Sequence, residues 1–471
     1  MTRTQSTLIP AKACRQCGLF LSGLLFITIA LGTTGLAEGD GSIPALAPTP
    51  LFTPAPSPLT TPLAQAITPR KTRGRWVRNQ RSVNITAAAL RALNPINPTQ
   101  HTEFTIDLFS AGAQLAELSP EHQPQGTQHR HIIWTGKLTQ DKESDVTLVL
   151  LGTTVAGAIR KGRTIYEIKP GADGTHDVTE IDSELLPSDH HPISVSSDEV
   201  AAGDVAAGMA APILPPATAA DNGTVIDVMV VYTTTVKNAN GGQNGIEALI
   251  ALGISLANTA FTNSQIATQF RLVHTAELAY PESGNYNTDL SRLRGTADGF
   301  LDDVHTLRDT HKADLVTLIG DNIGNACGVA YVMSSVNAGF ASSAFSVVDD
   351  DCISGHTLAH ELGHNMGSMH DRSEGGTGAF PYAFGHKEAG KFRTIMAYPC
   401  TPSCPRINHF SNPNVRYQGT WQTGVDHTVD PANSADNARA FTTALNTVAN
   451  FRNSGDTSAP PAPANFRIIS P

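Results

Sequence analysis

The residues of this chain that could do chemistry are concentrated in one short run, HELGHNMGSMH, from His360 to His370. On a helix, His360 and His364 lie one above the other, so both imidazoles can face one metal ion. Glu361 is placed to reach a water at that ion without binding the metal itself. A zinc ion would supply Lewis acidity, and Glu361 would act as general base in the attack of water on a carbonyl.

The third histidine can join the first two only if the helix ends abruptly. Gly367 follows His364 by three residues, and a glycine there can take the positive φ that ends a helix. The turn would bring His370 to the same ion and leave a fourth position open, as in catalytic zinc sites. A solvated helix that merely carries histidines is the plainer interpretation. The added glycine and histidine favour the metal site.

This long motif resembles that of the metzincin metallopeptidases, over the stretch from Val225 to Arg452. Asp371 directly follows the third histidine, as in the reprolysin or adamalysin branch. Met396 lies 26 residues after His370 and resembles the methionine turn beneath the zinc. An ordinary core methionine is the alternative. The resemblance implies a zinc endopeptidase.

Tyr398 departs from the adamalysin pattern. Its spacing from Met396 resembles that of astacins and serralysins, in which the tyrosine is an additional zinc ligand that can swing to the oxyanion. That resemblance implies that Tyr398 donates a hydrogen bond to the tetrahedral intermediate. A buried tyrosine without a catalytic role is the alternative.

The layout of the whole chain, together with the run FRTIMAYP, most resembles bacterial peptidyl-Asp metalloendopeptidases. The resemblance implies cleavage on the amino side of Asp or Glu. An acidic side chain in the pocket would need a cation, and Arg393, Arg406 and Arg416 are available. The sequence does not choose among them.

The elements that must position these residues follow an α/β pattern over 223–453. Five strands are expected, at Val225–Tyr232, Phe270–Val273, Asp314–Ile319, Gly328–Met333 and Ala344–Val348. Apolar residues at helical spacing between Ile246 and Phe261 and around Val304 predict helices between them. The fold class is therefore α/β, a metzincin-type catalytic domain with a mixed, roughly five-stranded sheet and an active-site helix. We expect Gly328–Met333 to be an edge strand along which a substrate lies antiparallel.

A β-rich segment is expected before this domain, over 75–195. Runs such as FTIDLF, HIIWTGKL, DVTLVLL and TIYEI are strand-like. Residues 38–74 are predicted to be a Pro-rich spacer, 196–222 a cleavable linker and 454–471 a Pro/Ala tail. The segment is interpreted as a pro-segment; a carbohydrate- or surface-binding module is the alternative. Because 38–326 contain no cysteine, some group other than a thiolate must block the zinc. A carboxylate or a histidine of the pro-segment is a candidate, and the sequence does not say which.

Residues 1–37 have the features of a secretory signal peptide. Arg3, Lys12 and Arg15 precede the apolar run LFLSGLLFITIAL, and Gly35 and Ala37 suit cleavage after Ala37. A transmembrane anchor is the alternative, but the run is shorter than the ~20 residues that span a bilayer. The mature chain would be secreted, with no stable membrane anchor.

Four cysteines remain in the mature chain, and an even number in an exported protein suggests disulfides. Three pairings are possible, of which Cys327–Cys352 and Cys400–Cys404 joins nearest neighbours. A structural zinc site with four cysteines is the alternative, although the spacings are not the usual CxxC pairs.

The sequence thus predicts a monomeric, secreted zinc endopeptidase made as a pro-enzyme, with proteins or peptides as substrates. The net charge of −10 argues against a nucleic-acid partner. A structural calcium ion is compatible with the sequence, but no motif points to one. A catalytically inactive relative that acts as an adhesin or binding module is the alternative. The intact Glu361 argues against it, because an inactive copy has no chemical need for that carboxylate.

Overall fold

The computed structural model describes residues 48–55, 74–94, 101–123, 127, 131–171, 173–195, 221 and 223–455. They belong to one compact unit, Pro48–Pro471. The predicted signal peptide, the predicted linker except for Asp221, and the predicted tail except for Ser454 and Gly455 lie outside the described residues.

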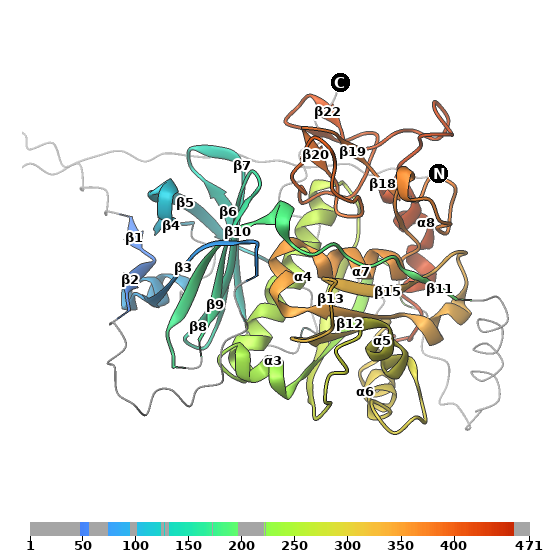
Figure 1. The fold of residues 1–471 in the computed structure, drawn as a ribbon, viewed down its shortest axis with the longest axis horizontal. Helices are drawn as coiled ribbons and strands as arrows, with labels where there is room; N and C mark the ends of the chain where they lie inside the picture. The colour runs from blue at the N-terminus through green and yellow to red at the C-terminus, as the bar shows by residue number, and fades with distance from the viewer. Residues whose placement is uncertain are drawn as a thin grey trace, which may run out of the picture. The chain divides into compact units, whose positions relative to one another are not determined.

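A ten-stranded sheet forms the first part of the fold (Figure 1), and all its neighbouring strands are antiparallel except β1 and β4. The strand order is β1-β4-β5-β6-β7-β8-β9-β10-β3-β2. Their bounds are β1 Thr49–Pro50, β2 Phe52–Pro54, β3 Val77–Ile85, β4 Thr102–Asp107, β5 Ala113–Pro120, β6 Ile132–Leu138, β7 Asp141–Leu151, β8 Thr154–Lys161, β9 Thr164–Pro170 and β10 His176–Asp182. One helix, α1 (Ala87–Leu93), packs on the sheet and is capped by the Thr86 side chain. The β-rich character expected of 75–195 is present.

The predicted spacer over 38–74 is wrong in its middle part. Thr49–Pro50 and Phe52–Pro54 are the two edge strands of this sheet. Leu51 between them is fully buried, and its amide donates to the carbonyl of Thr105 at 2.9 Å. Proline is tolerated on an edge strand, since its missing N–H leaves no ladder bond unmade. The Pro-rich composition therefore predicted a spacer, whereas buried Leu51 holds this stretch against the sheet.

The second sheet has six strands, one more than expected, in the order β11-β15-β16-β14-β12-β13. The bounds are β11 Ile193–Ser194, β12 Val225–Thr233, β13 Gln269–Leu278, β14 Leu315–Gly320, β15 Gly328–Val332 and β16 Phe345–Asp349. All pairs are parallel except β15 with β16. The extra strand, β11, is the end of the N-terminal segment and lies on the edge formed by β15 (Figure 1).

Helices accompany this sheet, as the α/β pattern predicts. They are α3 Thr234–Ala239, α4 Gln243–Asn263, α5 Tyr286–Arg294, α6 Asp303–His311, α7 Thr357–Asn365 and α8 Asn437–Val448. Among the described residues, α4 is the one helix long and apolar enough to cross a membrane. Its most apolar window is 83% buried inside the fold, which is typical of a core helix. Short two- and three-residue strands follow α7, at β17 Met369–Asp371, β18 Phe384–Gly385, β19 Lys387–Glu388, β20 Phe392–Arg393, β21 Arg416–Tyr417 and β22 Trp421–Gln422.

The ten-stranded sheet contacts the second part of the fold through α4 and the turn before α7. Ser255 on α4 donates to Glu121 at 2.5 Å. Lys169 on β9 pairs with Asp350 at 3.2 Å and with Asp351 at 2.9 Å.

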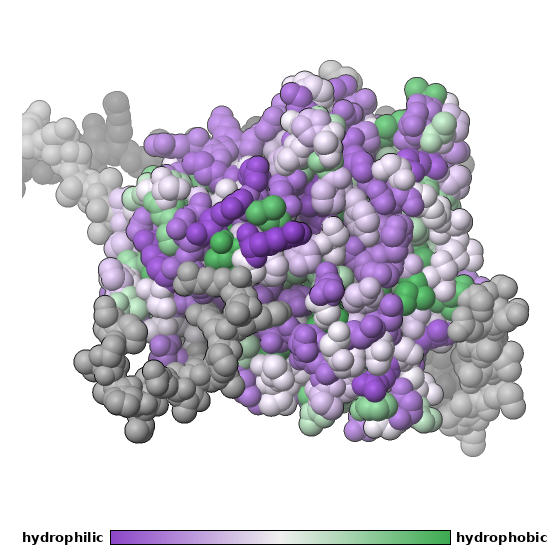
Figure 2. All heavy atoms as spheres, in the orientation of Figure 1, coloured by the Kyte–Doolittle hydropathy of each residue, from purple (hydrophilic) through white to green (hydrophobic). Residues whose placement is uncertain are grey.

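The face shown in Figure 2 is mostly hydrophilic, with apolar residues in small separate groups. Phe300 and Val429 are the large apolar side chains that are exposed among the described residues.

The four cysteines form two disulfides, as the even number suggested, and they join nearest neighbours, which the sequence left open among three pairings. Cys327 at the start of β15 is bonded to Cys352 in the turn before α7, and Cys400 is bonded to Cys404 in the loop that follows Tyr398. The first ties β15, which was expected at the sheet edge and is covered there by β11, to the turn that leads into α7. The four-cysteine zinc site is wrong, because both pairs are used up in disulfides.

Candidate active site

Three imidazoles meet at the C-terminal half of α7. His360 and His364 are on the helix and His370 is on β17, and all three are fully buried. Their Nε2 atoms are 3.1 Å apart for His360 and His364, 3.2 Å for His364 and His370, and 3.1 Å for His360 and His370. Three nitrogens on a tetrahedral zinc, each ~2.0–2.1 Å from the ion, would be ~3.3 Å apart. The donor set therefore fits one zinc ion.

The far side of two of these rings is fixed by backbone carbonyls. Nδ1 of His360 donates to the carbonyl of Ile395 at 2.9 Å, and Nδ1 of His364 to that of Ser368 at 2.7 Å. These bonds place the lone pair on Nε2, where the ion would lie. Burial lowers the pKa of His360 to about 4, although Asp189 opposes the shift, and burial also lowers the pKa of His364. Neutral imidazole is the form that binds metal.

The glycine predicted to end the helix does so. Gly367 has φ of 96° and its amide donates to the carbonyl of His364 at 2.9 Å. A Cβ at this position would lie 2.6 Å from the Cβ of Ala379. A residue other than glycine would therefore be strained in φ and would collide with the chain after β17. This turn is what brings His370 back to the helix.

Glu361 lies beside the first histidine with both carboxylate oxygens buried and without a hydrogen-bond partner among the described residues. Burial raises its pKa, the charge of Asp189 raises it further, and Arg406 opposes the shift. A Cβ at Gly328 on β15 would lie 2.7 Å from Oε1 of Glu361, so this glycine makes room for the carboxylate. An unpartnered buried acid with a raised pKa has the properties of a general base.

Met396 occupies a turn directly beneath α7. The amide of Ala397 donates to the carbonyl of Thr394 at 3.0 Å and closes the turn. Met396 is fully buried, and a Cβ at Gly363 would lie 2.6 Å from its sulfur. The thioether is thus in contact with the backbone of the active-site helix between the two helical histidines, as the resemblance to a methionine turn implied.

Asp371 connects the third histidine to the segment after this turn. Its carboxylate accepts from the amide of Tyr398 at 3.0 Å and pairs with Lys387 at 2.8 Å. Burial would raise the pKa of Asp371, but Lys387, Ser373 and the Tyr398 amide together lower it. The ring of Tyr398 lies against His370, with centroids 3.9 Å apart. Tyr398 is therefore at the site, held there through its backbone.

The N-terminal segment runs through this cleft. The amide of Cys327 donates to the carbonyl of Ser188 at 3.2 Å, and the amide of His190 donates to the carbonyl of Gly328 at 2.8 Å. Further along, Ile193 and Ser194 pair with β15 in the parallel sense. Residues 188–194 thus follow the edge strand, which the sequence predicted to receive a substrate, in the opposite direction to the one expected of a substrate.

Asp189 is the residue of this segment that penetrates deepest. Its Oδ2 lies 2.5 Å from Nη2 of Arg406, and its Oδ1 accepts from the hydroxyl of Thr357 at 2.9 Å. The carbonyl of Asp189 accepts from the Tyr398 hydroxyl at 2.6 Å. Burial would raise the pKa of Asp189, but the charge of Arg406 outweighs it and the pKa is lowered. The carboxylate is 3.5 Å from Nδ1 of His360, on the side of the ring away from the ion.

Sequence reasoning missed Asp189 and Thr357. It anticipated that a carboxylate or histidine would block the site, and a second candidate, His191, lies with its ring centroid 4.9 Å from that of His370. No local pattern in the run PSDHHPIS marks one of these residues. Of the three arginines proposed for an acidic substrate, Arg406 and Arg393 are buried at the site, whereas Arg416 is exposed elsewhere.

The comparisons with known sequences point the same way. The family described as metallo-peptidase family M12 matches residues 222–411. Peptidyl-Asp metalloendopeptidase from Xanthomonas campestris pv. campestris is 33% identical over 317 residues, which are 66% of this chain and 71% of that protein. The protein of the same name from Stenotrophomonas maltophilia strain K279a is 34% identical over 328 residues, 66% of this chain and 72% of its own. Another, from Pseudomonas fragi, is 31% identical over 201 residues, 42% of this chain and 99% of its own.

Solved structures are more distant. Metalloproteinase-II from Bacteroides fragilis matches with a TM-score of 0.35 and 12% identity, over 57% of this chain and 82% of that one. A chaperone–substrate complex matches with a TM-score of 0.39 and 19% identity, over 49% of this chain and 36% of that one. Likenesses of this size carry no argument about the site.

Proposed function

Because this chain belongs to the bacterial peptidyl-Asp metalloendopeptidases and carries a domain of metallopeptidase family M12, we propose that it is a pro-enzyme whose mature form cleaves on the amino side of acidic residues. That it is a zinc metalloendopeptidase follows from the family. The observation that carries the rest of the proposal is the segment Ser188–Ser194, which fills the cleft beside the three histidines and pairs an aspartate with a buried arginine.

The geometry of the site supports a catalytic role for each of these residues. His360, His364 and His370 would hold the ion through Nε2, and zinc would supply Lewis acidity for the attack of water on the scissile carbonyl. Glu361 takes the proton of the attacking water, since its carboxylate has no other partner, and passes it to the leaving amine. Tyr398 donates its hydroxyl hydrogen to the developing oxyanion once Asp189 has left.

Latency in the pro-form is steric. Residues 188–194 use the backbone groups of β15 that a substrate would need, and they also engage the Tyr398 hydroxyl. Because this segment runs parallel to β15, its peptide bonds are reversed relative to an antiparallel substrate. It is therefore held in the cleft without presenting a carbonyl in the productive orientation.

Maturation then requires a cut after Ser194 and before β12, the first strand of the metallopeptidase domain. The candidate bonds precede Asp198, Asp204 and Asp221. Asp221 is already fixed to the catalytic domain, since its amide donates to Asn450 at 2.9 Å and its carboxylate accepts from the hydroxyl of Ser454 at 2.8 Å. We expect the mature N-terminus at Asp221, or secondarily at Asp204 or Asp198.

Export is the remaining part of the proposal. Its support is the signal-like sequence of residues 1–37 and the two disulfides, which form in oxidising compartments. The mature enzyme is proposed to act as a secreted monomer on proteins or peptides. No observation favours an inactive adhesin. A surface-binding role for the ten-stranded sheet would require that it stay attached after maturation.

One experiment tests the proposal as a whole. The full chain is expressed with export, and the secreted product is analysed by N-terminal sequencing, zinc determination and digestion of a peptide library. We expect about one zinc per chain, a first residue of Asp at one of the three positions, and cuts before Asp or Glu. A stable secreted protein that begins near residue 38 and hydrolyses nothing would contradict the pro-enzyme and favour the binding module.

A further inference from the structure

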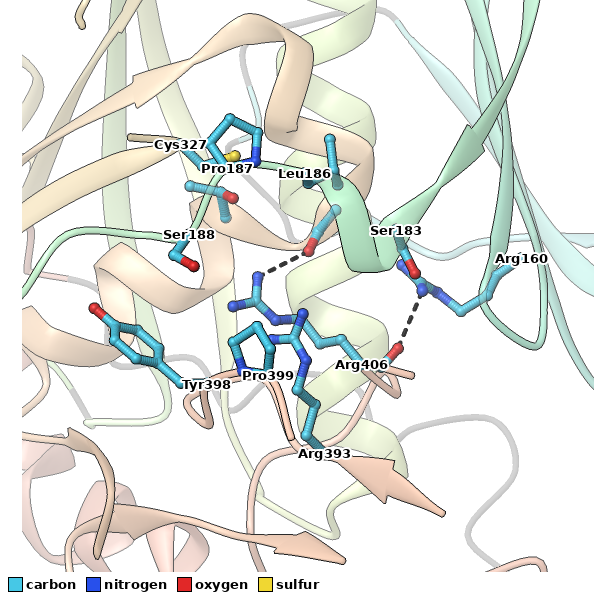
Figure 3. A pocket seen from close by; sticks show the side chains of 12 residues that line it. Arg160, Ser183, Leu186, Pro187, Ser188, Cys327, Arg393, Tyr398, Pro399 and Arg406 are labelled. Carbon is cyan, nitrogen blue, oxygen red and sulfur yellow. Dashed lines mark hydrogen bonds between the residues drawn. The ribbon is translucent and has the colours of Figure 1, made fainter. Parts of the chain in front are cut away.

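The pocket beside His360 contains two buried arginines whose acidic partners come from the N-terminal segment. Arg406 pairs with Asp189 at 2.5 Å, and Nε of Arg393 lies 4.0 Å from Oε1 of Glu184. Both guanidinium groups point into one pocket beneath the chain at Leu186–Ser188 (Figure 3). Among the described residues of the catalytic domain, no carboxylate forms an ion pair with either arginine within the salt-bridge distance.

Removal of the N-terminal segment therefore leaves these two arginines without their ion-pair partners. An unpaired buried charge is strongly unfavourable, whereas a paired one with additional hydrogen bonds is tolerated. Arg406 would stay in place, because its Nη1 also donates to the carbonyl of Gly355 at 3.1 Å. The mature enzyme thus has a fixed cation at the position that Asp189 has vacated, ready for another carboxylate.

The three arginines are not equivalent in this respect. Arg393 uses Nη1 to hold the carbonyl of Ala397 at 2.9 Å, next to Met396, so it supports the turn beneath the helix. Arg416 is exposed and donates to the carbonyl of Thr420 at 2.8 Å. Arg406 alone of these three meets a carboxylate that lies beside a histidine of the zinc site.

Thr357 completes the pocket from the other side. It is buried in the first turn of α7, and its hydroxyl donates to Oδ1 of Asp189 while Arg406 meets Oδ2. Each oxygen of the carboxylate therefore meets its own donor, the charged guanidinium for Oδ2 and the neutral hydroxyl for Oδ1. The side-chain amide of an asparagine has only one oxygen. Its NH2 group would face one of the two donors, which would then have no acceptor.

From this geometry we propose that Arg406 and Thr357 form the subsite that recognises the acidic side chain of the substrate, and that Asp189 occupies this subsite as a substrate mimic in the pro-form. This inference rests on the proposed function and names its specificity residues. Since Asp189 reaches both donors through a single methylene, Asp is expected to be a better substrate residue than Glu.

The test uses the full chain with a cleavage site for an unrelated protease placed in the linker at 205–210, so that maturation does not depend on the enzyme's own activity. Quenched peptides that differ only in one residue, Asp, Glu, Asn or Leu, measure kcat/KM. For Arg406→Met we expect the Asp peptide to lose ~10²–10³-fold, as for loss of a buried charge partner, and the Leu peptide to change little. Arg406→Lys should recover part of the Asp preference, and the exposed Arg416→Met is the matched control.

A second arm does not depend on the folding of an arginine variant. The synthetic peptide of residues 186–194 should inhibit the matured wild-type enzyme and remain intact, and the same peptide with Asp189→Asn should inhibit at least tenfold more weakly. Equal inhibition by the two peptides, or an Asp preference retained by Arg406→Met, would overturn the assignment. If matured wild-type enzyme hydrolyses none of the peptides, the proposed function itself has failed; if it cleaves without preferring Asp, the acidic subsite is wrong.

Discussion

Replacement of Glu361 by Gln isolates one step of the proposed reaction. Both carboxylate oxygens of Glu361 are buried without partners among the described residues, so an amide of the same shape breaks no hydrogen bond of the protein. The space is available because Gly328 has no side chain. We therefore expect the variant to keep its fold and its three-histidine site. The loss should be confined to proton transfer.

The size of that loss follows from the role. A positioned general base contributes ~10²–10⁴ to the rate. Glu361 is proposed to take a proton from water and to return it to the amine, so loss near the upper end, ~10⁴-fold in kcat, is expected. That corresponds to about 5 kcal/mol of barrier. A carboxylate that served only to shape the cleft would cost far less when replaced by its isostere.

The assay compares enzymes matured by an unrelated protease, with zinc content measured on the same samples. Glu277→Gln is the matched control, because that glutamate, on β13, pairs with Lys237 on α3 and does not touch the site. The full-length Glu361→Gln chain should also accumulate unprocessed. Zinc-loaded Glu361→Gln with activity within tenfold of wild type would refute the base assignment.

The remaining predictions address the third ligand, the tyrosine and the docking of the N-terminal sheet. His370→Ala should lose zinc to a chelator and abolish turnover, since two imidazoles hold the ion poorly; full zinc retention, measured by metal analysis, would contradict the ligand set. Tyr398→Phe should lower kcat by ~10²–10³ with little change in KM, measured by steady-state kinetics; an unchanged kcat would leave the tyrosine a structural role. Burial raises the pKa of Glu167 to about 7, with Lys169 opposing, so the folded pro-form holds a proton that the unfolded chain releases near pH 4.5. The contribution of Glu167 to stability is thus fully present below pH 4.5 and is lost as the pH rises through about 7, a change of up to about 3 kcal/mol. Urea midpoints at pH 5 and pH 8 should differ less in Glu361→Gln/Glu167→Gln than in Glu361→Gln, and equal differences would refute this.

The parts of the site that the sequence predicts are those that depend on local geometry. His360 and His364 share a helix face at a spacing of four, and Gly367 takes positive φ where the helix must end. Strands β12, β13, β14, β15 and β16 lie at the apolar runs where strands were expected, whereas β11 was not expected. These features involve residues that are near one another in the chain, so periodicity and turn chemistry suffice to place them.

The parts that the sequence did not predict depend on contacts between distant residues. Asp189 and Arg406 are separated by 217 positions, and nothing in the run around either residue specifies the other. The same holds for Leu51, whose burial against Thr105 turns a Pro-rich stretch into sheet edges. A charged or apolar residue in a polar segment gains its role only from the surface that it meets. Single-sequence reasoning could therefore list three arginines but could not select one.

The occupied subsite also bears on how the enzyme could spare its own N-terminal segment while cutting the linker. A pocket that accepts Asp would bind Asp189 in either chain direction, because the carboxylate meets the same two donors. Only the direction of the backbone differs, and Ile193 and Ser194 fix it as parallel to β15. An aspartate held in that direction places its side chain as a substrate would, but its peptide bonds run in the direction that is not cleaved. Recognition of aspartate by one subsite is therefore compatible with latency at Asp189 and with cleavage before Asp198 or Asp204, which follow Ser194 in the sequence.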